Sequence, residues 1–129
     1  MPKVYFFDLG IRNAILNNFL PLANRNDAGQ LFENFVFLEL KNKVSLGHIY
    51  FYRTLNKTEI DFVIEDSGQL ILIETKYKKL NRPIDERALK SFMAKNKAAK
   101  KAVVVNLNLN SQNHAIKYHD FRFIGSVVG

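Results

Sequence analysis

Cysteine and tryptophan are absent from the 129 residues of this chain, and proline occurs only three times. Without cysteine, neither a disulfide framework nor a thiolate metal site can form, which favours a reducing compartment and predicts a cytoplasmic protein. No apolar run is long enough to span a bilayer, and the N-terminal Met-Pro-Lys-Val-Tyr-Phe-Phe-Asp reaches an acid too soon for a signal peptide. The sequence therefore predicts neither a membrane segment nor a secreted scaffold.

Acidic residues are also scarce, with 12 Asp and Glu against 19 Lys and Arg, so the formal net charge is +7. This balance favours a polyanionic partner such as DNA, but solubility alone explains it equally well. Hydrophobic residues make up 47% of the chain and include 11 Phe, a composition typical of a globular protein with a packed core. The length predicts a single domain over 1–129.

Hydrophobic periodicity and turn residues predict the secondary structure. The expected helices cover 9–18, 28–44 and 84–97, and the expected strands cover 4–7, 49–54, 58–65, 70–76 and 101–107, with a loop over 19–27 and a further strand within 115–124. The helix over 28–44 is apolar on nearly all sides, which indicates a central position. A meander of three strands followed by a helix and a strand predicts an α/β fold, a mixed sheet flanked by helices.

The hairpin expected over 58–76 carries the most informative spacing. A turn centred on Ser67-Gly68 sets a register in which Asp61 faces Glu74 and Glu59 faces Lys76. Because side chains alternate along a strand, these four residues are expected to share one face of the sheet. The apolar residues Ile60, Phe62 and Ile64 are expected on the other face, opposite Thr75, Ile73 and Ile71.

Two carboxylates placed directly across a hairpin repel each other, and one of them would take up a proton. A divalent cation between Asp61 and Glu74 removes this conflict, and carboxylate oxygens suit Mg²⁺ or Mn²⁺. Lys76 projects beside the same site, where its ammonium group can orient water or stabilise charge on a phosphate. Glu33, an acid within the apolar helix, needs a partner and is the fourth candidate member of the site.

Structural roles account for each of these residues taken singly. Asp61 could be an exposed strand residue, Lys76 a simple cross-strand partner of Glu59, and Glu33 a solvent-facing helix residue. Taken together, these explanations leave an opposed carboxylate pair without a purpose, which favours a functional site.

Asp61 followed by Glu74-Thr75-Lys76 after a hairpin resembles the signature of the PD-(D/E)XK nuclease superfamily. The chain is most similar to one branch, the uncharacterised C-terminal domain of many bacterial and archaeal AAA-type ATPases. The resembling stretches are 5–13, 29–40, 50–54, 59–63 and 73–76. The resemblance implies a restriction-endonuclease-like fold, with Asp61, Glu74 and Glu33 as metal ligands and Lys76 as the catalytic lysine. Ile60 departs from the pattern, because the founding motif has proline there.

In such ATPases the nuclease-like domain follows an ATPase core, and this chain has no Gly-rich phosphate loop ending in Gly-Lys-Ser/Thr. The resemblance therefore implies either a C-terminal fragment of a larger ATPase or a solitary copy, with an AAA-type module as a partner in the same or another chain. Three hypotheses stay open: a metal-dependent nuclease acting on DNA, a catalytically silent nuclease-fold module, and a structural domain that forms a homo-oligomer.

Basic residues follow the predicted site directly. Lys78, Lys79 and Arg82 are the candidate phosphate contacts, with Arg87 and Lys90 further along the chain. A solvated loop and helix face is the alternative explanation. Arg53 could reach the site or be an ordinary surface residue. The three histidines are isolated and are predicted to be ordinary.

Overall fold

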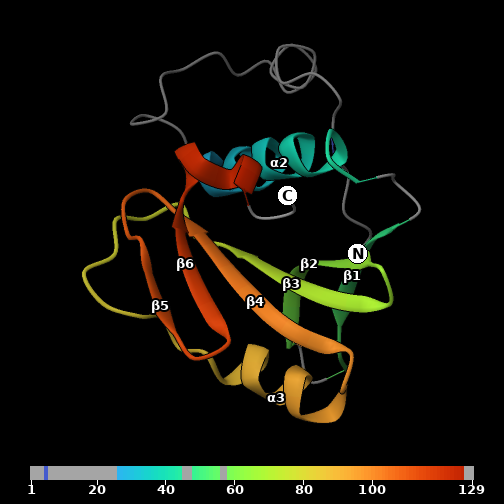
Figure 1. Ribbon diagram of the computed structural model, residues 1–129. Helices are drawn as coiled ribbons and strands as arrows, with labels where there is room; N and C mark the ends of the chain where they lie inside the picture. Colours follow the sequence, from blue (N-terminus) through green and yellow to red (C-terminus); the bar gives the residue numbers. More distant parts are fainter. Residues whose placement is uncertain (1–4, 6–25, 45–47, 56–57, 127–129) are drawn as a thin grey trace.

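The structure, a computed structural model, describes Tyr5 and residues 26–44, 48–55 and 58–126. The strand expected over 4–7 (Tyr5 apart), the helix over 9–18 and most of the loop over 19–27 lie outside these residues. Figure 1 shows α2 (Ala28–Lys41) on one face of a six-stranded sheet and α3 (Arg87–Lys95) on the other. The predicted α/β class, a mixed sheet flanked by helices, is confirmed.

The sheet combines an antiparallel and a parallel part. Its strands are β1 (Ile49–Arg53), β2 (Glu59–Asp66), β3 (Gln69–Thr75), β4 (Ala99–Asn106), β5 (Ser111–Asn113) and β6 (Ile116–Asp120), in the spatial order β1-β2-β3-β4-β6-β5. β1, β2 and β3 form the predicted meander, β4 pairs parallel with both β3 and β6, and β5 pairs antiparallel with β6. The Val-rich strand predicted over 101–107 is thus the interior strand β4.

Differences from the predicted elements fall at element ends and in the last third of the chain. α2 ends at Lys41 rather than at 44, and the strand expected within 115–124 ends at Asp120, where a 3₁₀ helix, η3 (Phe121–Ser126), begins. Strand β5 was not predicted, because all three of its residues are polar and exposed and so carry no hydrophobic alternation. Within the described residues, no helix is long and apolar enough to cross a membrane.

The predicted register of the β2–β3 hairpin is confirmed. Phe62 pairs with Ile73 and Asp66 with Gln69, around a two-residue turn at Ser67 and Gly68. Both turn residues have positive φ angles, 54° and 80°, as the tight hairpin turns that match strand twist require. The pairing ends at Phe62 and Ile73, so Asp61 and Glu74 lie just beyond the last pair of the ladder.

The expected common face of Ile60, Phe62 and Ile64 is wrong. Phe62 and Ile64 pack in the core cluster beneath α2, whereas Ile60 packs in the second cluster, beneath α3. The cause is a β-bulge, because Tyr50 pairs with Val63 but Tyr52 pairs with Ile60, which leaves one extra residue on β2. The bulge contains Asp61, so simple alternation does not place the candidate site residues.

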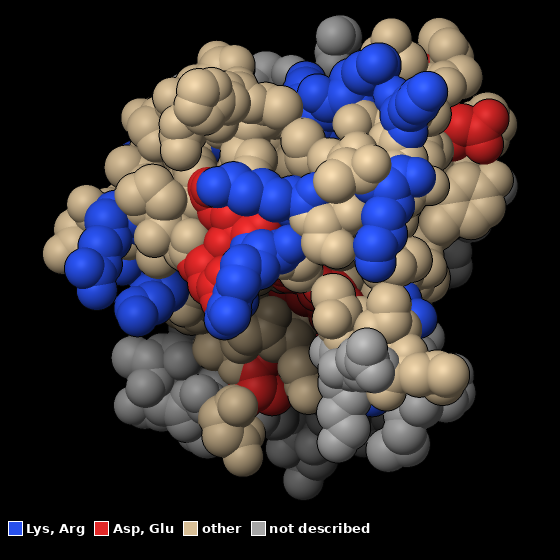
Figure 2. Space-filling view, turned by 90° about the horizontal axis from the view of Figure 1, so that it is seen from below, with Lys and Arg blue, Asp and Glu red and all other residues tan. Residues whose placement is uncertain are grey.

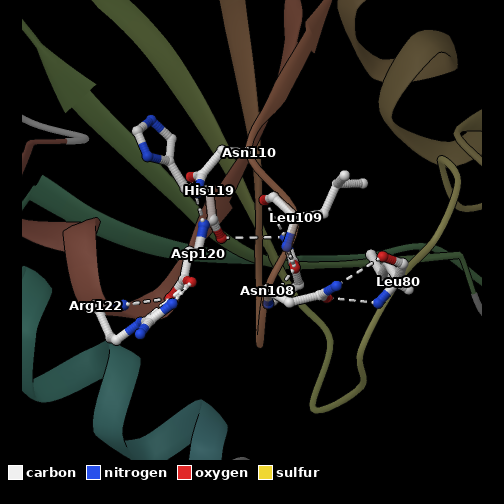
Figure 3. Close-up of polar contacts among 8 residues, drawn as sticks. Leu80, Asn108, Leu109, Asn110, His119, Asp120 and Arg122 are labelled. Carbon is white, nitrogen blue, oxygen red and sulfur yellow. Dashed lines mark hydrogen bonds and ion pairs between the residues drawn. The ribbon is translucent and has the colours of Figure 1, made fainter.

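Polar side chains hold the loop that follows β4. The buried side chain of Asn106 accepts hydrogen bonds from the backbone N–H groups of Asn108 (2.9 Å) and Leu109 (2.6 Å), and it donates to the carbonyl of His119 at 3.1 Å. The Asn108 amide in turn bonds both backbone groups of Leu80, as Figure 3 shows. These bonds fix the segment after the central strand and the loop that follows β3.

Candidate functional site

The four predicted site residues lie together in one polar groove of about 580 Å³, beside the N-terminal half of α2 and the end of the β2–β3 hairpin. Its lining consists of Gly29, Gln30, Glu33, Glu59, Asp61, Glu74, Thr75, Lys76 and Tyr77. α2 contributes Glu33, the bulge in β2 contributes Asp61, and the end of β3 contributes Glu74, with Lys76 immediately beyond it. The structure therefore brings Glu33, Asp61, Glu74 and Lys76 together.

Thr75 fixes one oxygen of Asp61. Its backbone N–H and its side-chain hydroxyl both donate to Oδ2 of Asp61, each at 2.8 Å. Simple alternation along β3 places Thr75 on the opposite, apolar face and does not predict this contact, because the bulge that turns Asp61 toward it has no sequence signal. Thr75 is thus a residue that orients a site carboxylate.

The pKa values of Asp61 and Glu74 are displaced in opposite directions. Burial raises the pKa of Glu74 to about 9, and its hydrogen bond to Asp61 and the charge of Asp61 add to this effect, which Lys76 opposes. Burial also disfavours the charged form of Asp61, but the hydrogen bonds from Glu74 and Thr75 outweigh it and lower the pKa of Asp61. Near neutral pH the pair therefore consists of an ionised Asp61 and a protonated Glu74.

Glu33 extends the pair to three carboxyl groups. A protonated Glu33 can donate a hydrogen bond to Asp61, which lowers the pKa of Asp61, whereas an ionised Glu33 raises the pKa of Glu74 through its charge. The buried Tyr5 hydroxyl faces Glu33, and burial and then the charge of Glu33 raise the pKa of Tyr5. Among the described residues, this buried hydroxyl has no hydrogen-bond partner. The sequence analysis did not identify Tyr5.

Basic side chains border the carboxyl groups. Lys76 is exposed, and its charge lowers the pKa of Glu74. Arg53 forms an ion pair with Glu59, with 3.2 Å between Nε and Oε1, so the partner of Glu59 is Arg53 and not the expected Lys76. Arg53, which the sequence left open, therefore lies at the edge of the groove.

The other predicted phosphate contacts lie outside the lining of the groove. Lys78, Lys79 and Arg82 are exposed on the loop after β3, while Arg87 forms an ion pair with Asp85. Figure 2 shows one face of the molecule on which carboxylates gather between Lys and Arg side chains. On this face acidic and basic groups are thus interspersed.

The donor chemistry of the groove suits a hard divalent cation, because three carboxyl groups provide oxygen ligands. Near neutral pH, however, Glu74 is protonated, and across 26–44, 48–55 and 58–126 no three His, Cys, Asp or Glu side chains are grouped as metal ligands. The proton on Glu74 must therefore leave before Asp61 and Glu74 can hold a cation together.

The fold and the groove define an α/β domain with a carboxylate-rich site at the end of a hairpin. Residues 28–121 match the model of a family described as a domain of unknown function, DUF4143, and the chain belongs to this family.

Two curated relatives are the uncharacterized protein Mb2031c of Mycobacterium bovis and the uncharacterized protein Rv2008c of Mycobacterium tuberculosis. Each is 28% identical over 105 residues, which is 80% of this chain but 23% of the relative. The chain thus spans about a quarter of the length of these relatives.

A similar solved structure comes from a half-complex of the tetradecameric assembly of Thermococcus gammatolerans McrB AAA+ hexamers with bound McrC. The match has a TM-score of 0.52 at 16% identity and covers 71% of this chain and 27% of the other. At this identity the likeness concerns the fold alone.

Proposed function

We propose that this domain binds DNA and hydrolyses phosphodiester bonds at the groove, in a reaction that depends on Mg²⁺ or Mn²⁺. The observation that carries the proposal is the meeting of Glu33, Asp61 and Glu74 beside Lys76, with a pKa of about 9 for Glu74. Ionisable groups with strongly shifted pKa values gather at functional sites more often than elsewhere. The resemblance of Asp61 and Glu74-Thr75-Lys76 to the nuclease signature points in the same direction.

In this proposal each residue has a distinct part. Asp61, Glu74 and Glu33 would hold the cation, which when bound would polarise the phosphate and lower the pKa of an attacking water. Thr75 keeps one Asp61 oxygen in place through its two hydrogen bonds. Lys76 would stabilise the negative charge that grows on the phosphate. Lys78, Lys79 and Arg82 would contact the backbone of the DNA.

Cleavage of labelled plasmid and oligonucleotide DNA with Mg²⁺ or Mn²⁺ tests the hydrolysis. Wild type is expected to cleave, and Glu74→Ala and Lys76→Ala are expected to lose about 100-fold or more of the rate. Asp66→Asn is the matched control, because Asp66 is an exposed acid at the turn of the same hairpin. Equal rates in wild type and Glu74→Ala would show that the groove does not catalyse the reaction.

Calorimetry tests cation binding separately. Titration with Mn²⁺ at pH 7 in two buffers of different ionisation enthalpy should reveal the release of about one proton, because Glu74 must deprotonate to bind. Asp66→Asn should bind like wild type, and Asp61→Asn should lose binding. Binding without proton release would contradict the protonated state of Glu74.

A second candidate function is a catalytically silent module that serves an AAA-type ATPase. Two observations favour it: a structure of similar fold comes from an assembly of AAA+ hexamers, and the curated relatives are about four times as long as the matching region. Within the described residues no three His, Cys, Asp or Glu side chains are grouped as metal ligands, which also fits a module that works without a metal.

The two functions differ in their dependence on a metal. A silent module would show no Mn²⁺ uptake and no cleavage in the calorimetric and plasmid assays while remaining folded. The second measurement is the ATP hydrolysis of a full-length relative, with and without this domain. If the domain stimulates hydrolysis, and still does so with the changes that correspond to Asp61→Asn and Glu74→Gln, the module is supported. A loss of that stimulation in both variants would contradict it.

A further inference from the structure

A second pocket, almost entirely apolar and called the aromatic pocket below, adjoins the carboxylate groove. It has a volume of about 330 Å³, and four aromatic rings contribute to its walls: Phe32, Phe35, Tyr77 and Phe121. Phe121 stands edge-on to both Phe32 and Phe35, with ring centroids 6.0 and 6.2 Å apart and interplanar angles of 78° and 76°. Phe32 and Phe35 are stacked with centroids 6.4 Å apart, and Phe121 presents its edge to both, so an open space remains between the rings.

The first turns of α2 separate this aromatic pocket from the groove. Ala28, Phe32 and Phe35 recur at helical spacing along one flank of α2 and line the pocket, whereas Gly29 and Glu33 line the groove. Tyr77 borders both hollows. A ligand in the groove that carries a flat apolar group could thus reach around the start of α2 into the pocket.

Tyr77 lies between two lysines in a tight turn. The backbone N–H of Lys78 donates to the carbonyl of Lys76 at 2.8 Å, which closes a three-residue turn centred on Tyr77. Two further backbone bonds tie the turn to β4 and its end, from Lys76 to Val105 at 2.8 Å and from Leu107 to Lys78 at 3.2 Å. Both lysines are exposed, so a fixed aromatic ring is flanked by two cations.

We infer that the aromatic pocket binds an unpaired nucleobase of the strand whose phosphate occupies the groove. Proteins that bind single strands combine cationic side chains along the backbone with aromatic rings on which bases stack, and this turn and pocket provide both. A base inside a duplex is paired and stacked, so only a single-stranded or locally unpaired base can enter. The inference rests on the proposed function, because it names the class of nucleic acid that the proposed site would take.

An apolar side chain of a protein partner is the rival occupant. It would also fill the pocket, but it would need neither the lysines around Tyr77 nor the continuity with the carboxylate groove. The exposed lysines before and after Tyr77, and the border that Tyr77 shares with the groove, therefore favour a base attached to a phosphate.

Fluorescence of 2-aminopurine, an adenine analogue whose emission is quenched when it stacks, tests this inference with the full chain and with Ca²⁺ in place of Mg²⁺ or Mn²⁺, so that a cation stays available between the carboxyl groups and the phosphate. When the protein binds a single-stranded oligonucleotide that carries the probe, the 2-aminopurine fluorescence should fall. The affinity for this single strand should be about 10-fold or more higher than for the same sequence in a perfect duplex. Phe35→Leu removes a ring, and Ala28→Phe fills the pocket from the first residue of α2 without deleting any core side chain. Each should weaken single-strand binding by about 5- to 100-fold.

Phe51→Leu is the matched control, because Phe51 is a half-exposed phenylalanine on β1, outside the pocket. Thermal melting checks that each variant is folded. If Phe35→Leu is unstable, the single-strand affinity of Ala28→Phe tests the inference in its place. Equal affinity for single strand and duplex, or pocket variants that bind the single strand like wild type, would overturn the inference and favour a protein side chain.

Failure of this inference can be told apart from failure of the proposed function. Cleavage of duplex DNA with Mn²⁺ but no quenching would leave the nuclease proposal standing and overturn the base pocket. The opposite result is quenching in wild type that is lost in Ala28→Phe, with no cleavage of DNA by either protein. This result would support the base pocket and overturn the proposed hydrolysis.

Discussion

Thr75 donates two hydrogen bonds to a single oxygen of Asp61, one from its backbone N–H and one from its hydroxyl, each at 2.8 Å. A backbone donor at this position belongs to the sheet ladder in a regular hairpin, and here it is directed to a side chain. The bulge in β2 is the reason, because the extra residue moves Asp61 out of the ladder and toward the end of β3. The bulge therefore accounts both for the irregular pairing of β2 and for the hydrogen bonds between Thr75 and Asp61.

Thr75→Val should weaken the site without disturbing the backbone. Valine keeps the shape and the N–H donor but lacks the hydroxyl, so the unfolding free energy should fall by about 1–2 kcal/mol and Mn²⁺ affinity should fall several-fold. Thr75→Ser, which retains the hydroxyl, should bind Mn²⁺ like wild type. Denaturant unfolding and calorimetry measure the two effects, and equal Mn²⁺ affinity in both variants would show that the hydroxyl does not orient Asp61.

Glu74 should make the stability of the fold depend on pH. Its folded-state pKa, about 9, lies above the ordinary 4.5, so the native chain binds more protons than the unfolded chain between these values. Its stabilising contribution is complete below about pH 4.5 and is lost as the pH rises toward 9. Wild type should therefore lose about 5 kcal/mol of unfolding free energy, relative to Glu74→Gln, between pH 5 and 9.

Urea unfolding of both proteins across this range measures the difference. Gln resembles the protonated acid and can still donate to Asp61, so Glu74→Gln should be the more stable protein at pH 9 in the absence of metal. Parallel pH profiles would mean that Glu74 is already ionised at neutral pH.

Local patterns were sufficient to predict the meander, the hairpin register and the interior position of β4. The turn at Ser67 and Gly68, flanked by apolar alternation, fixes the register from Asp66 and Gln69 to Phe62 and Ile73, and this register could be predicted from the sequence alone. The bulge could not be predicted, because it arises from the pairing of β2 with β1, and a single extra residue leaves no mark on composition. For that reason the face of Ile60 was predicted wrongly and the role of Thr75 was missed.

Contacts made across long stretches of chain account for the other omissions. Tyr77 and Phe121 are far apart in sequence and meet only where the end of β3 and η3 approach α2, so no motif contains both. The three polar residues of β5 carry no hydrophobic signal, and their strand exists because β6 offers them an edge. The site residues within the hairpin were therefore easier to predict than those brought together by the tertiary fold.

Asn106 tests how firmly the loop after β4 is held. Its buried amide bonds the backbone of Asn108, Leu109 and His119, so Asn106→Ala leaves several buried groups without partners and should lower the unfolding free energy by about 2–4 kcal/mol. Asn113→Ala, at an exposed position on β5, is the control and should change stability by less than about 0.5 kcal/mol. A similar small loss in both variants would show that the loop holds itself in place without Asn106.

The ion pair between Arg53 and Glu59 offers a test of the link between the groove and nucleic acid. Both side chains are about half exposed, so Glu59→Gln should change stability by less than about 1 kcal/mol. The substitution removes one negative charge from the groove and releases the Arg53 guanidinium for a phosphate. Affinity for single-stranded DNA should therefore rise several-fold, and the slope of log affinity against log salt should steepen by about one.

Asp66→Asn changes the net charge equally but at the far end of the hairpin, and it should leave both quantities nearly unchanged. Fluorescence anisotropy over a range of salt concentrations provides the comparison. A similar rise in affinity for both variants would mean that DNA senses only the overall charge, whereas a rise confined to Glu59→Gln places the phosphate backbone beside Arg53.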